Sequence, residues 1–529
     1  MARAYDAIIV GGGHNGLVCG TYLAKAGLKA LVLERRSLIG GACVTEEPWP
    51  GFKVSTGSYL MSLLQPKIIL DLELKKHGLE VLPTTPTFAP WPDGRSIVFW
   101  PDEAKLCAEF AKFSAKDAET YPRYRRMLER LTPFIREIIW ETPPNIASTR
   151  PRDLLRTAGF AFKYRKHAGL FYELYDIFTM SAYDYLTKWF ESDAVIAALG
   201  YYVHGGGTNA SMKMPATAFS CIRPLVRDNT TAAGTGGFVR GGMGSISNAI
   251  ARCGAAHGLE VRTDAPVARI NTVNGIAKGV TLADGEVLEA KCVIANANAK
   301  TTFLKLLPEA ELPSDFVQNV RNIRTRSSVF KVHLAADKLP EYTAFSSAER
   351  GFAYPVSVRI GHSIDYLERA YDDAKYGGFS RQPFLTVMAP SVFDDTLTPK
   401  GMHLLSIMGG HASYELKGRG WSQAREELLQ TTVDTIEAYA PGFRRHIVHS
   451  EILTPVDLEE RFDLPNGHVH HGDLTIDQQF FRRPVGGYAD YRTPVAQLYL
   501  CGSSAHPGGG VTGVPGHNAA REVLKDLGR

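Results

Sequence analysis

The stretch that decides the fold is Ala7-Ile8-Ile9-Val10-Gly11-Gly12-Gly13-His14-Asn15-Gly16, close to the amino end of the chain. Its four apolar residues predict a buried strand, and the glycines that follow have the G-x-G-x-x-G spacing of a dinucleotide-binding turn. We expect a helix from about Gly16 to Ala26 and a second strand from Ala30 to Glu34. A strand, a glycine turn, a helix and a second strand together predict the βαβ unit that binds dinucleotides.

Each residue of this motif has a physical task. Gly11 permits the tight turn, Gly13 lets the backbone approach a pyrophosphate, and Gly16 lets the helix pack closely on the strand. The amino terminus of the helix directs unpaired N–H groups at the phosphates. Glu34 follows about 20 residues later, where a carboxylate accepts hydrogen bonds from the ribose hydroxyls. A purely structural glycine turn explains this combination poorly.

Other residues must decide between NAD and FAD, because both bind such a unit. Gly40 and Gly41 follow the ribose acid closely, and glycines crowd the junction between a final strand and a final helix at 502–516. Backbone without side chains suits close approach to a flat or anionic group. These glycines favour FAD, whereas a nicotinamide-only dehydrogenase would leave the carboxyl-terminal junction unexplained.

The composition excludes several classes of protein. A net charge of +4 over 529 residues is too weak to indicate nucleic-acid binding. No apolar stretch is long enough to predict a membrane span. The seven cysteines are scattered without a CxxC pair, which argues against a disulfide scaffold, a zinc site or a dithiol reductase. With no secretory leader before the first strand, we expect a cytoplasmic protein, and we predict no metal site.

The pattern along the chain predicts an α/β protein with two domains. A Rossmann-like FAD-binding domain is built from discontinuous segments, and an α+β substrate domain is inserted between them. We assign residues 1–65, 228–300 and 481–529 to the FAD-binding domain, and residues 66–227 and 301–480 to the substrate domain. The first inserted segment has helical periodicity and proline breaks, as at Pro122.

Further motifs resemble those of the phytoene desaturase-related flavoproteins. Besides the first fingerprint they are Gly40-Gly41, Gly241-Gly242-Met243-Gly244, Asp284-Gly285-Glu286 with the run from Val293 to Ala297, and the run from His506 to Val511. The order and spacing agree over nearly the whole chain. Within this family the chain is most similar to the branch of pyridine nucleotide-disulphide oxidoreductase domain-containing proteins. It is more distantly similar to retinol saturases and to the flavin amine oxidase clan.

The resemblance implies a role for each of several residues. The ADP half of FAD would be held by Gly11, Gly13, Gly16, Glu34 and Arg35. Gly40 and Gly41 would pass beside the pyrophosphate and the ribityl chain, and the backbone of Val267 would meet adenine. Gly502 would approach the phosphates, and Gly513 and Val514 would lie at the pyrimidine edge of the flavin.

The chain also departs from the wider amine oxidase clan at two points. Ala42 follows the double glycine where many members have arginine, and Ser503 follows Gly502 where many flavoproteins have an acid. Neither change removes FAD binding, but both weaken any transfer of amine oxidation from the clan to this chain.

The expected reaction is hydride transfer from a substrate carbon to the flavin. The resemblance suggests a largely apolar, isoprenoid-like small molecule as substrate, with oxygen or a quinone taking the electrons. Desaturation of a carbon–carbon bond also needs a base. His506 is a candidate because it lies inside the motif at the flavin edge. His471 and, more weakly, Asp473 are candidates because their stretch lines the flavin pocket in the resembling family.

Other functions remain open at this stage. One is a flavin amine or alcohol oxidase, and another is a non-catalytic binding protein on a GDI-like fold, which the complete glycine fingerprint and Glu34 argue against. His204 is either a turn feature or a substrate-pocket residue. The aromatic segments 160–162 and 170–174 predict core packing, an apolar substrate tunnel or peripheral membrane contact. The sequence does not indicate an oligomeric state.

Overall fold

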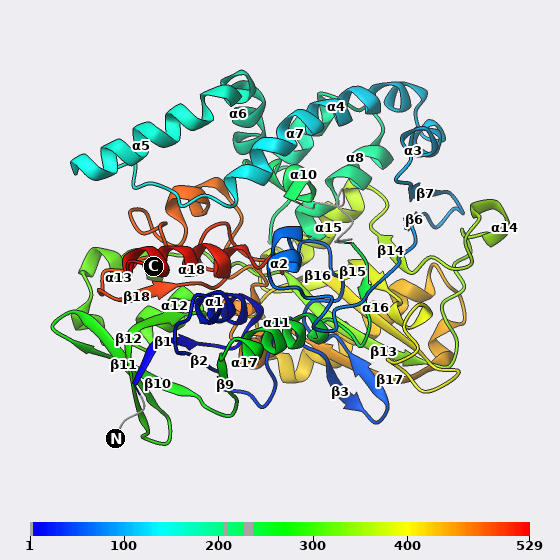
Figure 1. Cartoon of the computed structure of the whole chain (residues 1–529). Coiled ribbons are helices and arrows are strands. Elements are labelled where there is room, and N and C mark those ends of the chain that lie inside the picture. Colours follow the sequence, from blue (N-terminus) through cyan, green and yellow to red (C-terminus); the bar gives the residue numbers. More distant parts are fainter. Residues whose placement is uncertain (1–3, 206–208, 227–235) are drawn as a thin grey trace.

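Two large sheets and a layer of helices make up the protein. The computed structural model describes residues 4–205, 209–226 and 236–529, and in this part of the chain each of the two large sheets has seven strands. The sheets lie on opposite sides of the molecule, with long helices running along one edge of both (Figure 1). The boundary predicted at residue 228 and the Gly/Thr-rich stretch 230–235 lie outside the described residues.

The first sheet contains the predicted dinucleotide unit. Its strand order is β10-β11-β12-β1-β2-β9, and β18 pairs with β12 beyond this path. The strands are β1 (Ala4–Val10), β2 (Ala30–Leu33), β9 (Glu260–Arg262), β10 (Val267–Val273), β11 (Ile276–Leu282), β12 (Val287–Ala295) and β18 (Leu498–Leu500). β12, β1, β2 and β9 pair in parallel, as does β18 with β12, whereas β10 and β11 join as an antiparallel hairpin.

Helices cover this sheet because β1 and β2 are apolar on both faces. All four residues of β2 are buried, which is typical of a parallel strand between two helical layers. The packed helices are α1 (His14–Lys25), α11 (Gly244–Ala256) and α18 (Val514–Asp526). The α/β class and the Rossmann-like domain predicted from the sequence are therefore confirmed.

The second sheet is assembled from two distant segments. Its order is β17-β13-β16-β15-β14-β6-β7, antiparallel except for the β14–β6 pair. The strands are β6 (Thr87–Pro90), β7 (Ser96–Phe99), β13 (Val329–Ala336), β14 (Ser357–Ile360), β15 (Phe379–Met388), β16 (His403–Ala412) and β17 (Ile447–Leu453). One face packs on α16 (Trp421–Glu437) around Val433 and Ile436. The other face looks toward the helical layer and the cavity described below.

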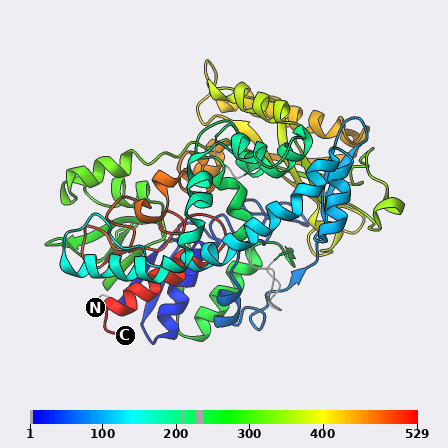
Figure 2. The same ribbon diagram turned by 90° about the horizontal axis from the view of Figure 1, so that it is seen from above.

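The helical layer comes mostly from the first inserted segment. Seen from above, its helices cross both sheets (Figure 2). They are α3 (Glu103–Ala111), α4 (Ala115–Ile138), α5 (Pro151–Tyr164), α6 (Phe171–Thr179), α7 (Ala182–Thr187), α8 (Asp193–Gly200), α9 (Tyr202–Gly205) and α10 (Phe219–Ile222). α15 (Ile364–Lys375) joins their core through Ile364 and Leu367.

Two expectations about this region differ from the structure. We expected Pro122 to break the helix, but α4 continues through both Pro122 and Pro133. The buried face of Tyr124, Met127 and Leu131 gives the helix enough packing to tolerate the lost backbone hydrogen bonds. In addition, the core of the first domain extends past the boundary predicted at residue 300, because Phe303, Phe316 and Val320 pack into it.

Candidate cofactor and substrate site

A cavity of about 650 Å³ connects the two domains. It begins at the glycine turn after β1 and ends on the face of the second sheet. At the dinucleotide end it is lined by Gly11, Gly13, Glu34, Arg35, Gly40, Gly41 and Val267, all of them predicted cofactor residues. At the other end the lining comes from the strands β6, β13, β14, β15 and β16. A long ligand could therefore contact both domains at once.

The glycine turn leaves open the space that a phosphate needs. Gly13 precedes α1 as its N-cap residue, and no side chain caps the helix, so the N–H groups of the first turn face the cavity end without a protein acceptor. A Cβ atom on Gly13 would lie 2.8 Å from Nδ2 of Asn296. On Gly16 it would lie 2.3 Å from the carbonyl oxygen of Gly11. Gly16 thus serves helix–strand packing, as expected, and is not part of the cavity wall.

Glu34 is fixed in place at the end of β2. The N–H of Gly12 donates to Oε2 of Glu34 at 2.8 Å, and the N–H of Arg36 donates to Oε1 at 3.0 Å. These bonds orient the carboxylate while leaving further lone pairs for hydroxyl donors. Nearby, Nη2 of Arg35 donates to the carbonyl of Glu460 at 2.8 Å and so connects the two domains. Arg35 therefore lies on the rim at this end of the cavity.

The double glycine and Val267 also lie where the sequence predicted. Gly40 and Gly41 have φ values of +118° and +58°, which L side chains rarely adopt. A Cβ on Gly40 would lie 2.2 Å from the carbonyl oxygen of Cys43, so only glycine fits this turn. Val267 begins β10 and lines the cavity with Ala265 and Pro266. Together with Glu34 they surround the end expected to take the adenosine.

Besides Gly16, three further predicted cofactor residues do not form part of the cavity wall. Gly502 packs against the backbone of Asn296, where a Cβ would lie 2.4 Å from the carbonyl oxygen. Gly513 is the N-cap of α18 at a φ of +75°, and its neighbour Val514 is fully buried. The cavity instead contacts Gly510, Val511 and Ser503. The residues that face the cavity are thus neighbours of the predicted ones: Ser503 follows Gly502, and Gly510 and Val511 each come three positions before Gly513 and Val514.

His506 is not positioned as a base toward the cavity. Its Nε2–H donates to the carbonyl of Ile138, at the end of α4, at 3.1 Å, and the ring is buried outside the cavity lining. Burial lowers the pKa of His506 to about 4, so the ring is neutral near neutral pH. The geometry corrects our expectation: His506 joins α4 to the carboxyl-terminal loop.

His471 does line the cavity. It adopts a left-handed backbone conformation with a φ of +59°, and its Nδ1 lies 3.5 Å from Oγ of Ser504. Burial is the main reason why its pKa falls to about 3. A histidine with such a pKa is a weak proton acceptor, so His471 is better suited to hydrogen bonding than to general base catalysis.

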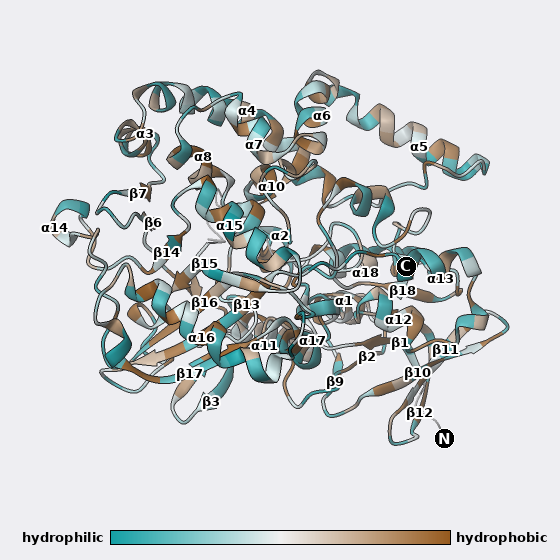
Figure 3. Ribbon diagram, turned by 180° about the vertical axis from the view of Figure 1, so that it is seen from behind, coloured by the Kyte–Doolittle hydropathy of each residue, from teal (hydrophilic) through white to brown (hydrophobic). Residues whose placement is uncertain are grey.

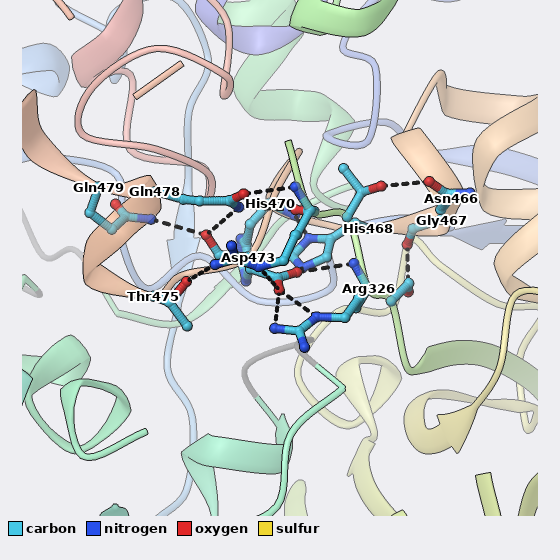
Figure 4. A network of polar contacts seen from close by, with 12 residues as sticks. Arg326, Asn466, Gly467, His468, His470, Asp473, Thr475, Gln478 and Gln479 are labelled. Carbon is cyan, nitrogen blue, oxygen red and sulfur yellow. Dashed lines mark hydrogen bonds and ion pairs between the residues drawn. The ribbon is translucent and has the colours of Figure 1, made fainter. Parts of the chain in front are cut away.

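Asp473 lies beside His468, His470 and Arg326, to which dashed contacts join it in part (Figure 4). It is fully buried, and its carboxylate accepts hydrogen bonds from the N–H of Arg326 at 3.0 Å and from Nε of Arg326 at 2.7 Å. Nε2 of His468 lies 3.6 Å from the same carboxylate. Asp473 does not line the cavity. The loop that carries His470 and His471 is therefore attached to the segment before β13 by a buried carboxylate.

The substrate end of the cavity is formed by one row of residues across the second sheet. Lys331 of β13 is in register with Met408 of β16, Met408 with Thr386 of β15, and Thr386 with Arg359 of β14. All four line the cavity. Directly opposed residues on paired strands share a face, so the row forms a continuous floor. Tyr59 and Tyr201 also line the cavity, and the floor has Met408 and Thr386 between two basic side chains.

Lys331 is the most unusual group in the cavity. Its side chain is only 2% exposed, Nζ donates to Oγ of Ser406 at 3.0 Å, and Nζ lies 4.0 Å from the centre of the Tyr59 ring. Among the described residues it forms no ion pair. Burial lowers the pKa of Lys331 well below its ordinary value. A lysine whose pKa is lowered in this way loses its proton more readily, and in its neutral form it can accept a proton from a ligand.

The sequence analysis missed Lys331 and Arg359. A signal was present for the first, because Lys331 and His333 interrupt the otherwise apolar strand Val329 to Ala336. A charged residue in a fully buried strand is rare unless it has a function or a partner. Arg359 has no comparable signal, since a single arginine in a short strand is ordinary.

Comparison with known proteins agrees with this arrangement. Residues 16–524 match the family described as flavin containing amine oxidoreductase. The chain belongs to this family. It is 38% identical to pyridine nucleotide-disulfide oxidoreductase domain-containing protein 2 of Rattus norvegicus, over 99% of this chain and 94% of that protein. It is 23% identical to a lycopene-forming phytoene desaturase of Pseudescherichia vulneris, over 96% of both chains.

A solved structure shows the same fold. Putrescine oxidase, in its wild-type form bound to putrescine, covers 100% of both chains with a TM-score of 0.60 and 16% sequence identity. Members of the flavin containing amine oxidoreductase family bind a flavin, and the residues of the present chain fit one. Uncapped N–H groups at α1, glycines whose Cβ atoms would block the turn, and an oriented Glu34 carboxylate form a cradle for an anionic dinucleotide.

Proposed function

We propose that the chain binds FAD and oxidises a largely apolar small molecule by hydride transfer from carbon. The observation that supports this most is the cavity itself, which runs without interruption from the Glu34 end to the floor of Lys331 and Met408. In such a space the adenosine end and the reacting end of one long cofactor can be held by different domains. A bound flavin would supply the two-electron acceptor.

Residues of the chain account for the other half of the reaction. When a carbon–carbon single bond becomes a double bond, one carbon loses a hydride and its neighbour loses a proton. The buried amine of Lys331 is placed to take that proton, and Tyr59 keeps the amine away from water. His471 would hold the cofactor or substrate by hydrogen bonding. Oxygen or a quinone would then remove the electrons and complete the cycle.

The first test is colour. Purified protein should be yellow, or become yellow when FAD is added, and the flavin released on denaturation should be FAD. A folded protein that binds no FAD would refute the proposal and favour a non-catalytic protein on the same fold. A thermal-shift response to NADH with none to FAD would instead favour a nicotinamide dehydrogenase.

The second test concerns the reaction. Anaerobic mixing of oxidised enzyme with isoprenoids, aromatic alcohols and primary amines should bleach the flavin only with a compound that loses hydrogen from a carbon skeleton. Bleaching by primary amines alone would replace our proposal with amine oxidation.

We also propose that the surface of α5 and α6 contacts a membrane at its periphery. Only Tyr164 of α5 is buried, whereas several large apolar side chains on this surface are exposed: Leu154, Leu155, Phe162, Phe171, Tyr172 and Tyr175. Residues 150–180 contain six basic and three acidic side chains. Hydrophobic and hydrophilic positions alternate along α5 on the outside of the molecule (Figure 3). Apolar rings beside basic groups suit an anionic lipid surface.

The structure bears on this proposal in one further way. Within the described residues, no helix combines the length and the apolar character needed to cross a bilayer. Contact through α5 and α6 would therefore be limited to the membrane surface.

A further inference from the structure

The described carboxylates that line the cavity are confined to one end, whereas basic side chains line both ends. Its two carboxylates, Glu34 and Asp463, both lie at the dinucleotide end among the described lining residues. Glu34 accepts two backbone N–H groups, and Asp463 accepts from Asn298 and Thr301. The lining contributed by the second sheet contains Lys331 and Arg359 and no acid. Among the described residues, this end of the cavity therefore has the positive charge of Arg359 without a matching carboxylate.

Arg359 shows this lack of a carboxylate partner most clearly. It is half-buried on β14, and Nη2 donates to the hydroxyl of Tyr202 at 2.6 Å. The guanidinium carbon lies 4.6 to 5.2 Å from the ring centres of Tyr202, Tyr201 and Phe99. Within the described part of the chain no carboxylate pairs with it. Of its five N–H donors, one therefore has a protein acceptor.

The aromatic contacts prepare this arginine for a ligand. A guanidinium that lies against rings is already fixed in orientation, so little side-chain entropy remains to be lost when an anion binds. The edges of the guanidinium match carboxylate and phosphate oxygens in a two-point contact. A charge kept in an apolar cavity without a counter-ion is costly, and the ligand is the group that can supply the missing negative charge.

The position of Arg359 separates this role from cofactor binding. β13, with Lys331, is next to β17, and the helix that follows β17, α17 (Pro455–Phe462), contacts the first domain through Arg35 and Glu460. Arg359 lies three strands further from that contact, or about 14 Å between backbones at the usual strand spacing. It is thus at the far end of the floor from the proposed proton acceptor.

We infer that the substrate is an amphipathic molecule whose anionic head group, a carboxylate or a phosphate, binds Arg359 while its apolar body lies over Met408 and Thr386. This inference rests on the proposed function and makes it more specific. It places the carbon that reacts, near Lys331, several bonds away from the head group. It also disfavours a cationic amine, which would meet the positive Arg359 and, among the described lining residues, no acid at this end.

The experiment compares four ligands of equal chain length that differ in the head group. Equilibrium dialysis of decanoate, decyl phosphate, decanol and decylamine against oxidised protein gives the affinities, and the perturbation of the flavin absorbance shows whether binding occurs beside the flavin. We expect at least one anion to bind about ten- to a hundred-fold more tightly than decanol, as a charge-assisted hydrogen-bond pair provides, and decylamine to bind most weakly. The better of the two anions identifies the head group.

Variants assign the preference to one side chain. Arg359→Met should reduce the preference for the anion to less than about threefold, and Arg359→Lys should keep part of it because the charge remains. Arg381→Met on the neighbouring strand is the control, because its side chain is 86% exposed and is paired with Asp373. Equal binding of all four ligands, tightest binding of decylamine, or an unchanged preference in Arg359→Met would each overturn the inference. Failure of the proposed function would be seen separately, as protein that binds no flavin at all.

Discussion

At the scale of single residues, the site depends on positions where a side chain is absent. A Cβ on Gly13 would approach only the end of the Asn296 side chain, which can move, so the fold should tolerate a larger residue there. A phosphate cannot move aside in the same way, because its place is fixed by the N–H groups of α1. Cofactor binding and folding can therefore be separated at this position.

We predict that Gly13→Val abolishes FAD binding while the protein remains folded. The branched side chain would fill the space that the pyrophosphate needs. The measurement is flavin absorbance per mole of purified protein, together with the far-ultraviolet circular dichroism spectrum. Gly159→Val is the matched control, since nothing lies within 4 Å of a Cβ built there. Equal FAD content in the two variants would show that the glycine turn has only a structural role.

Lys331 leads to a prediction about rate and pH. As a proton acceptor it acts in the neutral form, so flavin reduction should speed up as the pH rises through its pKa and then level off. Because burial lowers that pKa well below the ordinary value, the plateau should begin far below the pH at which exposed lysines lose their protons. Lys331→Met should slow anaerobic flavin reduction by about a hundredfold or more and remove this pH dependence. Lys278→Met, an exposed position on β11, should change neither.

A stability measurement shows whether Lys331→Met is simply misfolded. The lowered pKa means that the unfolded chain binds more protons than the folded chain between the folded and unfolded pKa values of this lysine. The lysine therefore costs stability at neutral pH, and this cost disappears as the pH rises through that window. Lys331→Met should be at least as stable as the wild type at neutral pH, with a difference that shrinks as the pH rises. A variant that is less stable at neutral pH would mean that its slow reduction has another cause.

At the scale of elements, the local sequence pattern was sufficient to predict single helices and strands. The helix α1 and the strand β2 were predicted to within about two residues of their observed bounds. What the sequence could not give was which strands of the second sheet are neighbours. β6 pairs with β14 although about 270 residues separate them. The β13–β16, β16–β15 and β15–β14 pairings, which bring Lys331 and Arg359 onto one floor, also join strands that no local pattern identifies as neighbours. His506 was misplaced for the same reason, because its partner Ile138 comes from a distant helix.

The loop that carries Asp473, before the final strand β18, allows a test of how a buried carboxylate supports the site. Removing the buried carboxylate in Asp473→Ala would leave the guanidinium and the N–H of Arg326 without their acceptor. We expect the free energy of unfolding to fall by about 2 to 3 kcal/mol, together with weaker flavin binding, because His470 and His471 lose their support. Asp477→Ala should cost less than about 1 kcal/mol, since that carboxylate is half exposed where it pairs with Arg324. Chemical denaturation monitored by fluorescence would measure both, and equal losses would contradict the role assigned to Asp473.

At the scale of the whole molecule, the proposed function divides cofactor and substrate binding between the two sheets. The Rossmann-like sheet was predictable because its strands have strong, local motifs at three separate places in the sequence. The cavity was not predictable, because the residues that line it come from segments up to several hundred residues apart. The helical layer closes this space on one side, and α5 extends beyond it, touching the 481–490 segment through Phe160 with Phe481 and Arg156 with Asp490.

This outer position of α5 gives the last prediction. If α5 and α6 lie on a membrane, the protein should sediment with vesicles that contain phosphatidylserine, and added salt should weaken the association because basic residues provide part of the attraction. Leu155→Glu should lower the bound fraction about tenfold, since it replaces a leucine that is 75% exposed with a charge that anionic lipid repels. Leu70→Glu on α2 (Pro66–Asp71) is the matched control, because that leucine is 64% exposed but lies away from this surface. If the two variants and the wild type bind vesicles equally, the exposed rings of α5 and α6 do not serve a lipid surface.

If an apolar substrate enters from the membrane, Leu155→Glu should also slow turnover with vesicle-borne substrate while leaving turnover of a soluble one unchanged.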